Sequence, residues 1–245
     1  GFDKYFQIAP CFRDEDSRAD RSPGEFYQLD FEMSFVNQED IFNAIEPILF
    51  EIFDENKSFN RSVPAKISNF PFPRIPYNES LEIYGTDKPD LRNPLLISDY
   101  SSIFVNSDFK IFSDKVSRGN VVKGIVVENC SHKPRSFFDK LNAWAREEGA
   151  AGLGFISFID NQYKGPIAKN LSEEKLKKLN LKEGDSIFFI CDSLKEAQNF
   201  SGKVREKICF EMDILDKNSF KFCWIVDFPM YELDEKTNKL QFSHN

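Results

Sequence analysis

The chain contains 245 residues, carries a formal net charge of −8 and is 41% hydrophobic, a proportion typical of globular proteins. Its 11 glycines and 12 prolines are too few for a collagen-like or low-complexity chain. No apolar run approaches the ~20 residues that a transmembrane helix needs, and the length allows a sizeable core in one large domain or two small ones.

The first 36 residues predict two strands joined by a charged loop. Residues 3–13 and 26–36 read as the strands, and residues 14–25 as the loop. Alternation gives the second strand one apolar and one polar face. The apolar face comprises Tyr27, Leu29, Phe31, Met33 and Phe35, and the opposite face comprises Phe26, Gln28, Asp30, Glu32 and Ser34. In an antiparallel hairpin, Gln7 and Arg13 of the first strand share this polar face.

Two helices are expected next. Asn37 is a suitable N-cap for a helix over residues 38–54, in which Pro47 removes one hydrogen bond and can introduce a kink. A shorter helix is expected over residues 78–84, ending at Gly85, because glycine readily adopts the left-handed conformation that ends many helices.

After residue 93 the pattern changes and predicts a self-contained α+β module. Strands are expected over 121–127, 153–159 and 186–191, and helices near 135–148, from Ser172 onward, and near 193–200 and 202–209. Residues 94–206 carry 17 basic and 15 acidic side chains, a net charge of +2, which leaves −10 on the remainder. A last strand is expected over residues 221–228.

The cysteines and histidines do not favour a zinc site. The five cysteines stand at positions 11, 130, 191, 209 and 223 without a C-x-x-C pair, and the only histidines are His132 and His244. We expect buried free thiols, as in a reducing cytosol.

The densest group of charges lies between Arg13 and Arg21, where three of the ten arginines occupy nine residues. A solvated hairpin loop with weak ion pairs is one explanation. The neighbouring polar strand face favours another, in which arginine binds phosphate, Phe26 stacks on a base and a carboxylate binds an ammonium group. An ordinary half-solvated antiparallel sheet remains the alternative for that face.

Familiar nucleotide-binding motifs are absent from the sequence. It contains no G-x-x-x-x-G-K-[ST], and the glycine-rich run Gly149–Gly154 has the wrong glycine order for G-x-G-x-x-G. We expect this run to end a helix and form a tight turn.

Two segments around the charged loop closely resemble motif 2 of the class II aminoacyl-tRNA synthetases, in particular the bacterial-type aspartyl-tRNA synthetases. They read Phe12-Arg13-Asp14-Glu15-Asp16-Ser17-Arg18-Ala19-Asp20-Arg21 and Glu25-Phe26-Tyr27-Gln28-Leu29-Asp30-Phe31-Glu32-Met33-Ser34-Phe35. The resemblance continues through Tyr84–Arg92, Trp224–Glu232 and His244. Residues 94–206 resemble the inserted GAD-type domain of the bacterial enzymes.

The resemblance implies an α+β fold. Residues 1–93 and 207–245 would form part of the antiparallel-sheet catalytic core, interrupted by the insertion at 94–206. Motif 1, motif 3 and the anticodon-binding barrel are not found in the sequence. Strand-like sequence follows Gly1 at once and no closing element precedes Asn245, so we expect a fragment that does not form the adenylate by itself.

Roles for individual residues also come from the resemblance. Arg13 is implied to contact the ATP α-phosphate and the amino acid carboxylate, Glu15 the amino side of adenine, and Phe26 the adenine ring. Gln28 and Asp30 are implied to surround the bound aspartate, with Asp30 next to its ammonium group. The remaining implied site residues are Asp14, Arg21 and Ser22 near ATP or the tRNA end, His244 at the aspartate pocket, and Glu32 behind the site.

Two positions depart from the family pattern. Ser22 stands where the family often has glutamine, with Gly24 as an apparent one-residue insertion, which puts a direct contact to ATP in doubt. Asn245 replaces a second histidine, although asparagine still offers a hydrogen-bond donor.

The implied activity is that of an aspartate–tRNA ligase, a cytoplasmic and homodimeric enzyme whose substrates are aspartate, ATP and tRNA for aspartate. Mg²⁺ would enter with ATP, with no metal ligand in this chain and no membrane involved. Whether tRNA for asparagine is also charged stays open. An asparagine or lysine synthetase, and a non-catalytic paralogue or binding module that retains the sheet, are the alternatives.

Overall fold

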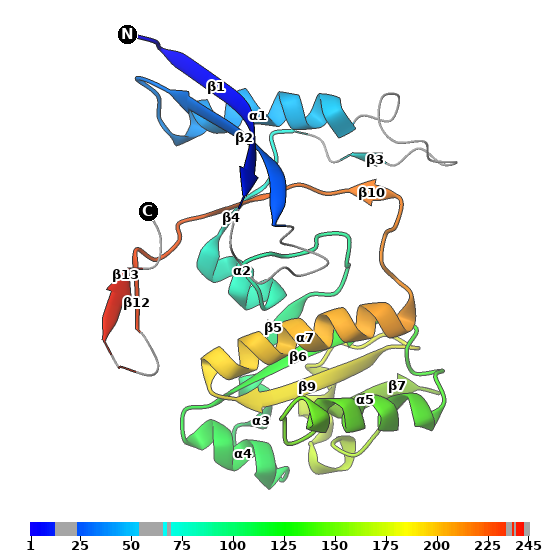
Figure 1. Ribbon diagram of the computed structural model, residues 1–245. Coiled ribbons are helices and arrows are strands. Elements are labelled where there is room, and N and C mark those ends of the chain that lie inside the picture. Colours follow the sequence, from blue (N-terminus) through cyan, green and yellow to red (C-terminus); the bar gives the residue numbers. More distant parts are fainter. Residues whose placement is uncertain (13–23, 54–65, 68–69, 234–236, 238, 243–245) are drawn as a thin grey trace. The chain divides into compact units, whose positions relative to one another are not determined.

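The computed structural model describes residues 1–12, 24–53, 66–67, 70–233, 237 and 239–242. The chain divides into two compact units, Gly1–Pro71 and Phe72–Asn245. Figure 1 labels their helices and strands where there is room.

The first unit begins with the predicted hairpin. Strands β1 (Lys4–Phe12) and β2 (Glu25–Met33) pair antiparallel in an unbroken register, from Lys4 opposite Met33 to Phe12 opposite Glu25. The predicted continuation of the second strand to residue 36 is wrong. Phe35 has a φ of 59°, in the left-handed region, which an extended strand cannot accommodate.

Helix α1 (Gln38–Phe53) confirms the predicted helix and its cap. The Asn37 side chain accepts a hydrogen bond from the Asp40 amide at 3.1 Å, and the Asp40 carboxylate accepts one from the Asn37 amide at 2.9 Å. This reciprocal pair satisfies two amides that the first turn leaves without helical partners. Pro47 lies inside α1, and β3 (Lys66–Ile67) is the last described element of this unit.

The second unit is built around a five-stranded antiparallel sheet with the order β5-β6-β9-β7-β8. Its strands are β5 (Ile97–Asp99), β6 (Val121–Val127), β7 (Gly154–Ile159), β8 (Gln162–Lys164) and β9 (Ser186–Asp192). The three longest strands confirm the predictions at 121–127, 153–159 and 186–191 to within a residue.

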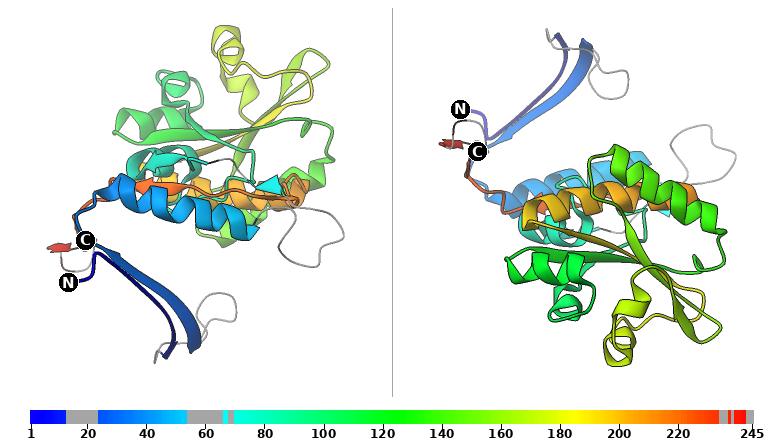
Figure 2. Two further views of the ribbon diagram at one scale, coloured as in Figure 1. Left: turned by 90° about the horizontal axis from the view of Figure 1, so that it is seen from above. Right: turned by 90° about the horizontal axis from the view of Figure 1, so that it is seen from below.

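Helices cover both faces of this sheet, as Figure 2 shows in its right-hand view. On one face, α5 (Arg135–Glu147) and α7 (Leu194–Met212) pack against Phe188 and Ile190 of β9. Ile187 and Phe189 point to the other face, which holds a second hydrophobic cluster. Burial on both sides explains the continuous apolar run of β9. The second face is covered by α3 (Ser101–Phe104), α4 (Lys110–Ser117), the 3₁₀ helix η1 (Ala168–Asn170) and α6 (Glu173–Lys177).

Helix α7 corrects the prediction of two helices at 193–200 and 202–209. It runs unbroken from the N-cap Ser193, whose hydroxyl accepts from the Glu196 amide, to Asp213, which adopts a left-handed conformation. Gly202 is buried inside it and does not end it. A Cβ at Gly202 would lie 2.5 Å from the carbonyl oxygen of Gly85, so this glycine allows a close approach between two backbones.

Helix α2 (Tyr77–Tyr84) ends at Gly85, whose φ is 72°, as predicted. The expected strand over 221–228 is wrong in its length, because β11 (Trp224–Val226) is the one strand within that range and β10 (Ser219–Phe220) ends just before it. β11 pairs in parallel with β4 (Arg74–Pro76), and Asp227 then turns the chain with a φ of 58°. β12 (Tyr231–Leu233) and β13 (Leu240–Phe242) form a further antiparallel pair.

The glycine-rich run after α5 is a helix end and turn, as predicted, with left-handed φ values of 91° at Gly149 and 147° at Gly152. All five cysteines are free, but only Cys130 and Cys209 are buried, so the expectation of burial is wrong for the other three. No helix in the described part of the chain is both long and apolar enough to cross a membrane.

Candidate functional site

The polar face predicted for the second strand is present on the hairpin. The register places Gln7 directly opposite Asp30 and Ala9 opposite Gln28. The Gln7 side-chain amide donates a hydrogen bond of 3.2 Å from Nε2 to the Asp30 carboxylate. This bond orients the carboxylate across the strand pair, and among the described residues the other carboxylate oxygen keeps its capacity to accept a hydrogen bond from a ligand.

The polar side chains follow one another along this face. Phe26, half-buried, lies opposite Cys11 near the end that leads to residue 13, and Glu32 lies opposite Tyr5 towards the other end. The Cys11 thiol lies 3.9 Å from the Gln28 side-chain oxygen. Phe26 and Asp30 are separated by four residues, about 13 Å along a strand. An aromatic ring and a carboxylate at this separation can contact two different parts of one extended ligand.

The other face of the hairpin is apolar, as expected from the alternation. It presents large side chains that are more than half exposed in the structure: Phe6, Ile8, Phe12, Tyr27 and Leu29. The two faces therefore differ in chemistry as the sequence predicts.

Six of the predicted site residues lie outside the described residues. They are Arg13, Asp14, Glu15, Arg21, Ser22 and His244. Their roles remain predictions, whereas Phe26, Gln28, Asp30 and Glu32 are placed on one face by the hairpin register.

The segment Tyr84–Arg92, which also resembles the synthetases, forms an ordered turn after α2. The Arg92 guanidinium binds both carboxylate oxygens of Asp90, donating from Nε to Oδ1 at 2.9 Å and from Nη2 to Oδ2 at 2.7 Å. These bonds lower the pKa of the Asp90 carboxyl below its ordinary value. The Ser80 hydroxyl donates to the Thr86 carbonyl at 2.7 Å and closes the turn on α2.

Arg205 of α7 holds this turn, and the sequence analysis did not identify it. Its guanidinium donates to the carbonyl oxygens of Leu95 at 2.6 Å, Asp90 at 3.0 Å and Asn93 at 2.8 Å. The residue is only 1% exposed, and burial lowers the pKa of its guanidinium. The sequence did offer one signal for a buried arginine: Arg205 stands next to Val204, on the otherwise apolar face of a predicted helix.

Lys123 is the second buried cation that sequence reasoning missed. It lies in the middle of β6, is 1% exposed, and forms ion pairs with Glu82 of α2 and, at 3.3 Å, with Asp99. The Gln198 side chain of α7 donates to the same Glu82 carboxylate at 3.1 Å. A lysine inside the apolar run Val121–Val127 was the signal, because a lysine is almost never fully buried without a partner.

The third resembling segment, Trp224–Glu232, contacts the region around α2. β11 pairs with β4, the strand that leads directly into α2, and the Phe228 ring lies 4.9 Å from the ring of Tyr77 between centroids. The second unit thus brings two of the resembling segments to the same helix, although about 130 residues separate them in sequence.

Comparison with known proteins agrees with this reading of the residues. The chain is 54% identical over its whole length to the "Aspartate--tRNA(Asp/Asn) ligase" of Rickettsia bellii (strain OSU 85-389), of which the aligned part is 40%. It is 55% identical over its whole length to the ligase of the same name from Paramagnetospirillum magneticum (strain ATCC 700264 / AMB-1), of which the aligned part is 28%. The protein of that name from Gluconobacter oxydans (strain 621H) is 53% identical, with 41% of its length aligned.

The chain therefore spans about 40% of the length of the Rickettsia and Gluconobacter relatives, and 28% of the length of the Paramagnetospirillum relative. The family model of tRNA synthetases class II (D, K and N) matches residues 1–244. With a match across nearly every residue, the chain belongs to the class II tRNA synthetases of the D, K and N group.

Proposed function

We propose that the protein containing this chain is an aspartate–tRNA ligase, which activates aspartate with ATP and transfers it to tRNA. The observation that carries this proposal is the 54% identity over the whole chain to ligases of that name. The polar hairpin face supports it, because it offers an aromatic ring and an oriented carboxylate about 13 Å apart along one strand.

At the nucleotide end of this face, Phe26 would stack on adenine and Glu15 would approach its amino group. Arg13 would bind the α-phosphate through its planar pair of N–H donors and neutralise charge that gathers there during attack. Asp14, Arg21 and Ser22 would line the path of the remaining phosphates and of the tRNA end.

At the amino acid end, Asp30 would accept a hydrogen bond from the ammonium group of aspartate, with Gln28 beside it. Gln7 would position Asp30 through the bond already described. Glu32 would support the residues that touch the ligand without touching it itself, and His244 would line the pocket around the aspartate side chain.

No side-chain nucleophile is required for this reaction. An aspartate carboxylate oxygen attacks the α-phosphorus, the bond to pyrophosphate breaks, and aspartyl-adenylate forms. A ribose hydroxyl of the tRNA end then attacks the activated carbonyl carbon, and AMP leaves. Mg²⁺ would enter as part of the ATP complex, and we assign it no ligand in this chain. The protein would contribute positioning and charge stabilisation.

We further propose the domain organisation that the resemblance implies. Residues 1–93 and 207–245 would belong to the catalytic core, and residues 94–206 to a GAD-type insertion. The boundary at 206 falls inside α7, so the last turns of that helix would belong with the core. The names of the relatives support tRNA for aspartate and tRNA for asparagine as substrates. A cytoplasmic homodimer is proposed on the family resemblance alone.

Aspartate-dependent ATP–pyrophosphate exchange by the full-length protein tests this function. Arg13→Lys should lower the exchange rate at least about tenfold, since one charge-assisted hydrogen bond contributes roughly 1.5–3 kcal/mol. Asp30→Asn should mainly raise the KM for aspartate, because it removes the partner of the ammonium group. Arg118→Lys is the matched control, since Arg118 is exposed at the end of α4 and should leave both parameters unchanged.

One outcome would overturn the proposed function, and another would overturn the role of Arg13 alone. A wild-type protein without exchange activity that also fails to bind a non-hydrolysable aspartyl-adenylate mimic in calorimetry would be a non-catalytic module. Equal activity of the Arg13→Lys and wild-type proteins would remove Arg13 from the mechanism. Charging of both tRNA transcripts, measured separately, tests the two tRNA substrates.

A further inference from the structure

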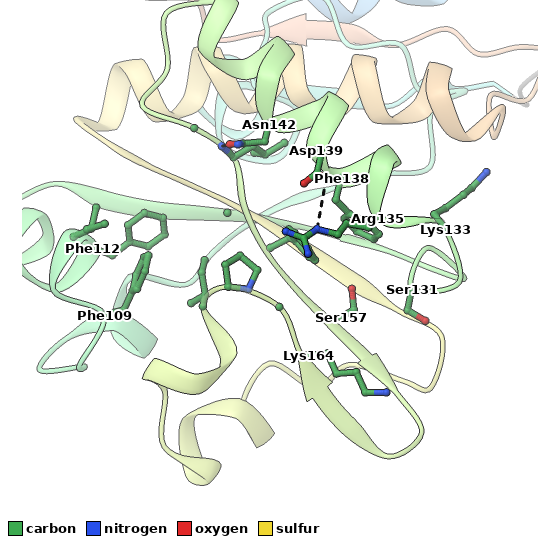
Figure 3. Close-up of a pocket in the computed structure, with 18 of the residues that line it drawn as sticks. Phe109, Phe112, Ser131, Lys133, Arg135, Phe138, Asp139, Asn142, Ser157 and Lys164 are labelled. Carbon is green, nitrogen blue, oxygen red and sulfur yellow. Dashed lines mark hydrogen bonds and ion pairs between the residues drawn. The ribbon is translucent and has the colours of Figure 1, made fainter.

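The second unit contains a cleft of about 890 Å³, and none of the site residues that the structure describes lines it. Its walls are one side of α5, strand β7 along its length, the turn at Gly165–Ile167 and two phenylalanines at the start of α4 (Figure 3). The volume lies within the roughly 300–1,000 Å³ usual for small-molecule sites.

The charged groups of the cleft are mainly cationic. Lys133, Arg135, Arg146 and Lys164 line it, with Asp139 as the acidic residue. Lys164 is neutralised by Asp160 at 2.7 Å, and Arg135 Nε lies 3.6 Å from Asp139. Within the described parts of the chain, Lys133 and Arg146 have no acidic partner. The cleft therefore carries uncompensated positive charge.

The positive end of α5 adds to this charge. The helix has no acidic residue in its first turn and no side-chain cap, so its first amides keep their positive partial charge. Arg135 is the first residue of this helix and points into the cleft, whereas Lys133 extends away from it, with its ammonium 5.6 Å from the centroid of the Phe137 ring. The Ser131 hydroxyl on the same wall also lacks a hydrogen-bond partner among the described residues. An anionic group would find its strongest attraction there.

Aromatic rings line other parts of the cleft. Phe109 and Phe112 meet edge to face with centroids 4.9 Å apart, and in Figure 3 they lie on the side opposite Lys133. Phe155 stacks on Phe138 at 4.2 Å in the wall formed by β7 and α5. Arg135 points into the space between these groups. A ligand that fills the cleft would combine an anionic end with a flat apolar ring.

We propose that this cleft binds a nucleoside monophosphate unit, with its phosphate at Arg135 and its base towards Phe109 and Phe112. Arginine suits a phosphate group, and aromatic side chains suit the face of a base. A free nucleotide and the end of an RNA chain share this chemistry. The proposal does not depend on the ligase function.

Calorimetry with AMP tests this site in the full-length protein, with a saturating aspartyl-adenylate mimic present to occupy the proposed catalytic site. Arg135→Gln should weaken AMP binding at least tenfold. Arg118→Gln, which removes the same charge from an exposed position outside the cleft, should leave it unchanged. Ribose 5-phosphate, which lacks a base, should bind at least tenfold more weakly than AMP.

Three results would overturn the proposal: no AMP binding by the wild-type protein, equal binding by the two variants and the wild type, or equal binding of AMP and ribose 5-phosphate. A 5′-phosphorylated RNA trinucleotide that binds more tightly than AMP identifies an RNA end as the ligand, and weaker or equal binding identifies the free nucleotide. AMP binding at the cleft in a protein without exchange activity would overturn the ligase proposal alone.

Discussion

A single buried side chain, Arg205, determines the conformation of the turn after α2. Three carbonyl oxygens from Asp90, Asn93 and Leu95 accept its hydrogen bonds, and the Asn93 side chain donates back to the Arg205 carbonyl at 3.2 Å. Its guanidinium also lies 5.1 Å from the centroid of the Tyr84 ring. The buried positive charge of Arg205 is therefore stabilised by hydrogen bonds to carbonyl oxygens, where a carboxylate would be the more usual partner.

We predict that Arg205→Met destabilises the protein by about 2–5 kcal/mol, because several buried carbonyl groups lose their donor at once and each unsatisfied group costs about 1–3 kcal/mol. Urea unfolding of the two variants Arg205→Met and Arg118→Met provides the measurement. The second variant removes an exposed arginine and should change the free energy of unfolding by less than about 0.5 kcal/mol. Equal midpoints for the two variants would contradict the role given to Arg205.

The polar hairpin face was predictable from sequence because its pattern is local. Alternation along residues 26–33 determines which side chains share a face, and the pairing of Gln7 with Asp30 follows once an antiparallel hairpin is assumed. The end of the strand was not predictable, because Phe35 carries no signal for a left-handed backbone. Short elements such as β5, with three residues, fall below the length at which periodicity is visible.

Helix α7 shows a different limit of sequence patterns. A glycine within a helical pattern indicates either a break or a close contact, and only the tertiary structure distinguishes them. Gly202 makes a contact, because the backbone of Gly85 lies against it. The same reasoning applies to the buried Arg205 and Lys123, whose partners are distant in sequence and could not be inferred from local patterns.

We predict that Gly202→Ala destabilises the protein by more than about 2 kcal/mol, although alanine is the better helix former by about 1 kcal/mol. The added Cβ would lie 2.5 Å from the Gly85 carbonyl oxygen, and both partners are backbone atoms that cannot rotate away. Thermal or urea unfolding measures the effect. Glu206→Ala, at an exposed position of the same helix, is the control and should be neutral or slightly stabilising. A stabilised Gly202→Ala variant would show that the two helices do not pack as described.

At the scale of the whole molecule, the proposed insertion is tied to the proposed core by buried contacts. Residues 94–206 supply Lys123 and Gln198 to Glu82, and Gly202 to Gly85. They also supply Arg205 to the turn at Asp90. The resemblance describes the segment 94–206 as an insertion, yet it supports the adjacent turn that also resembles the family.

This arrangement predicts the effect of replacing residues 94–206 by a short Gly/Ser linker. Amide hydrogen exchange should become at least about tenfold faster over residues 82–93, because Glu82 and the turn lose their buried partners. The amides of α1 belong to the other compact unit and serve as the internal control for general unfolding. Unchanged exchange over 82–93, with α1 still protected, would show that the turn is stable without these contacts. If exchange does increase, a loss of tRNA affinity in this deletion variant is explained by the altered turn, and it would not show that the insertion itself touches tRNA.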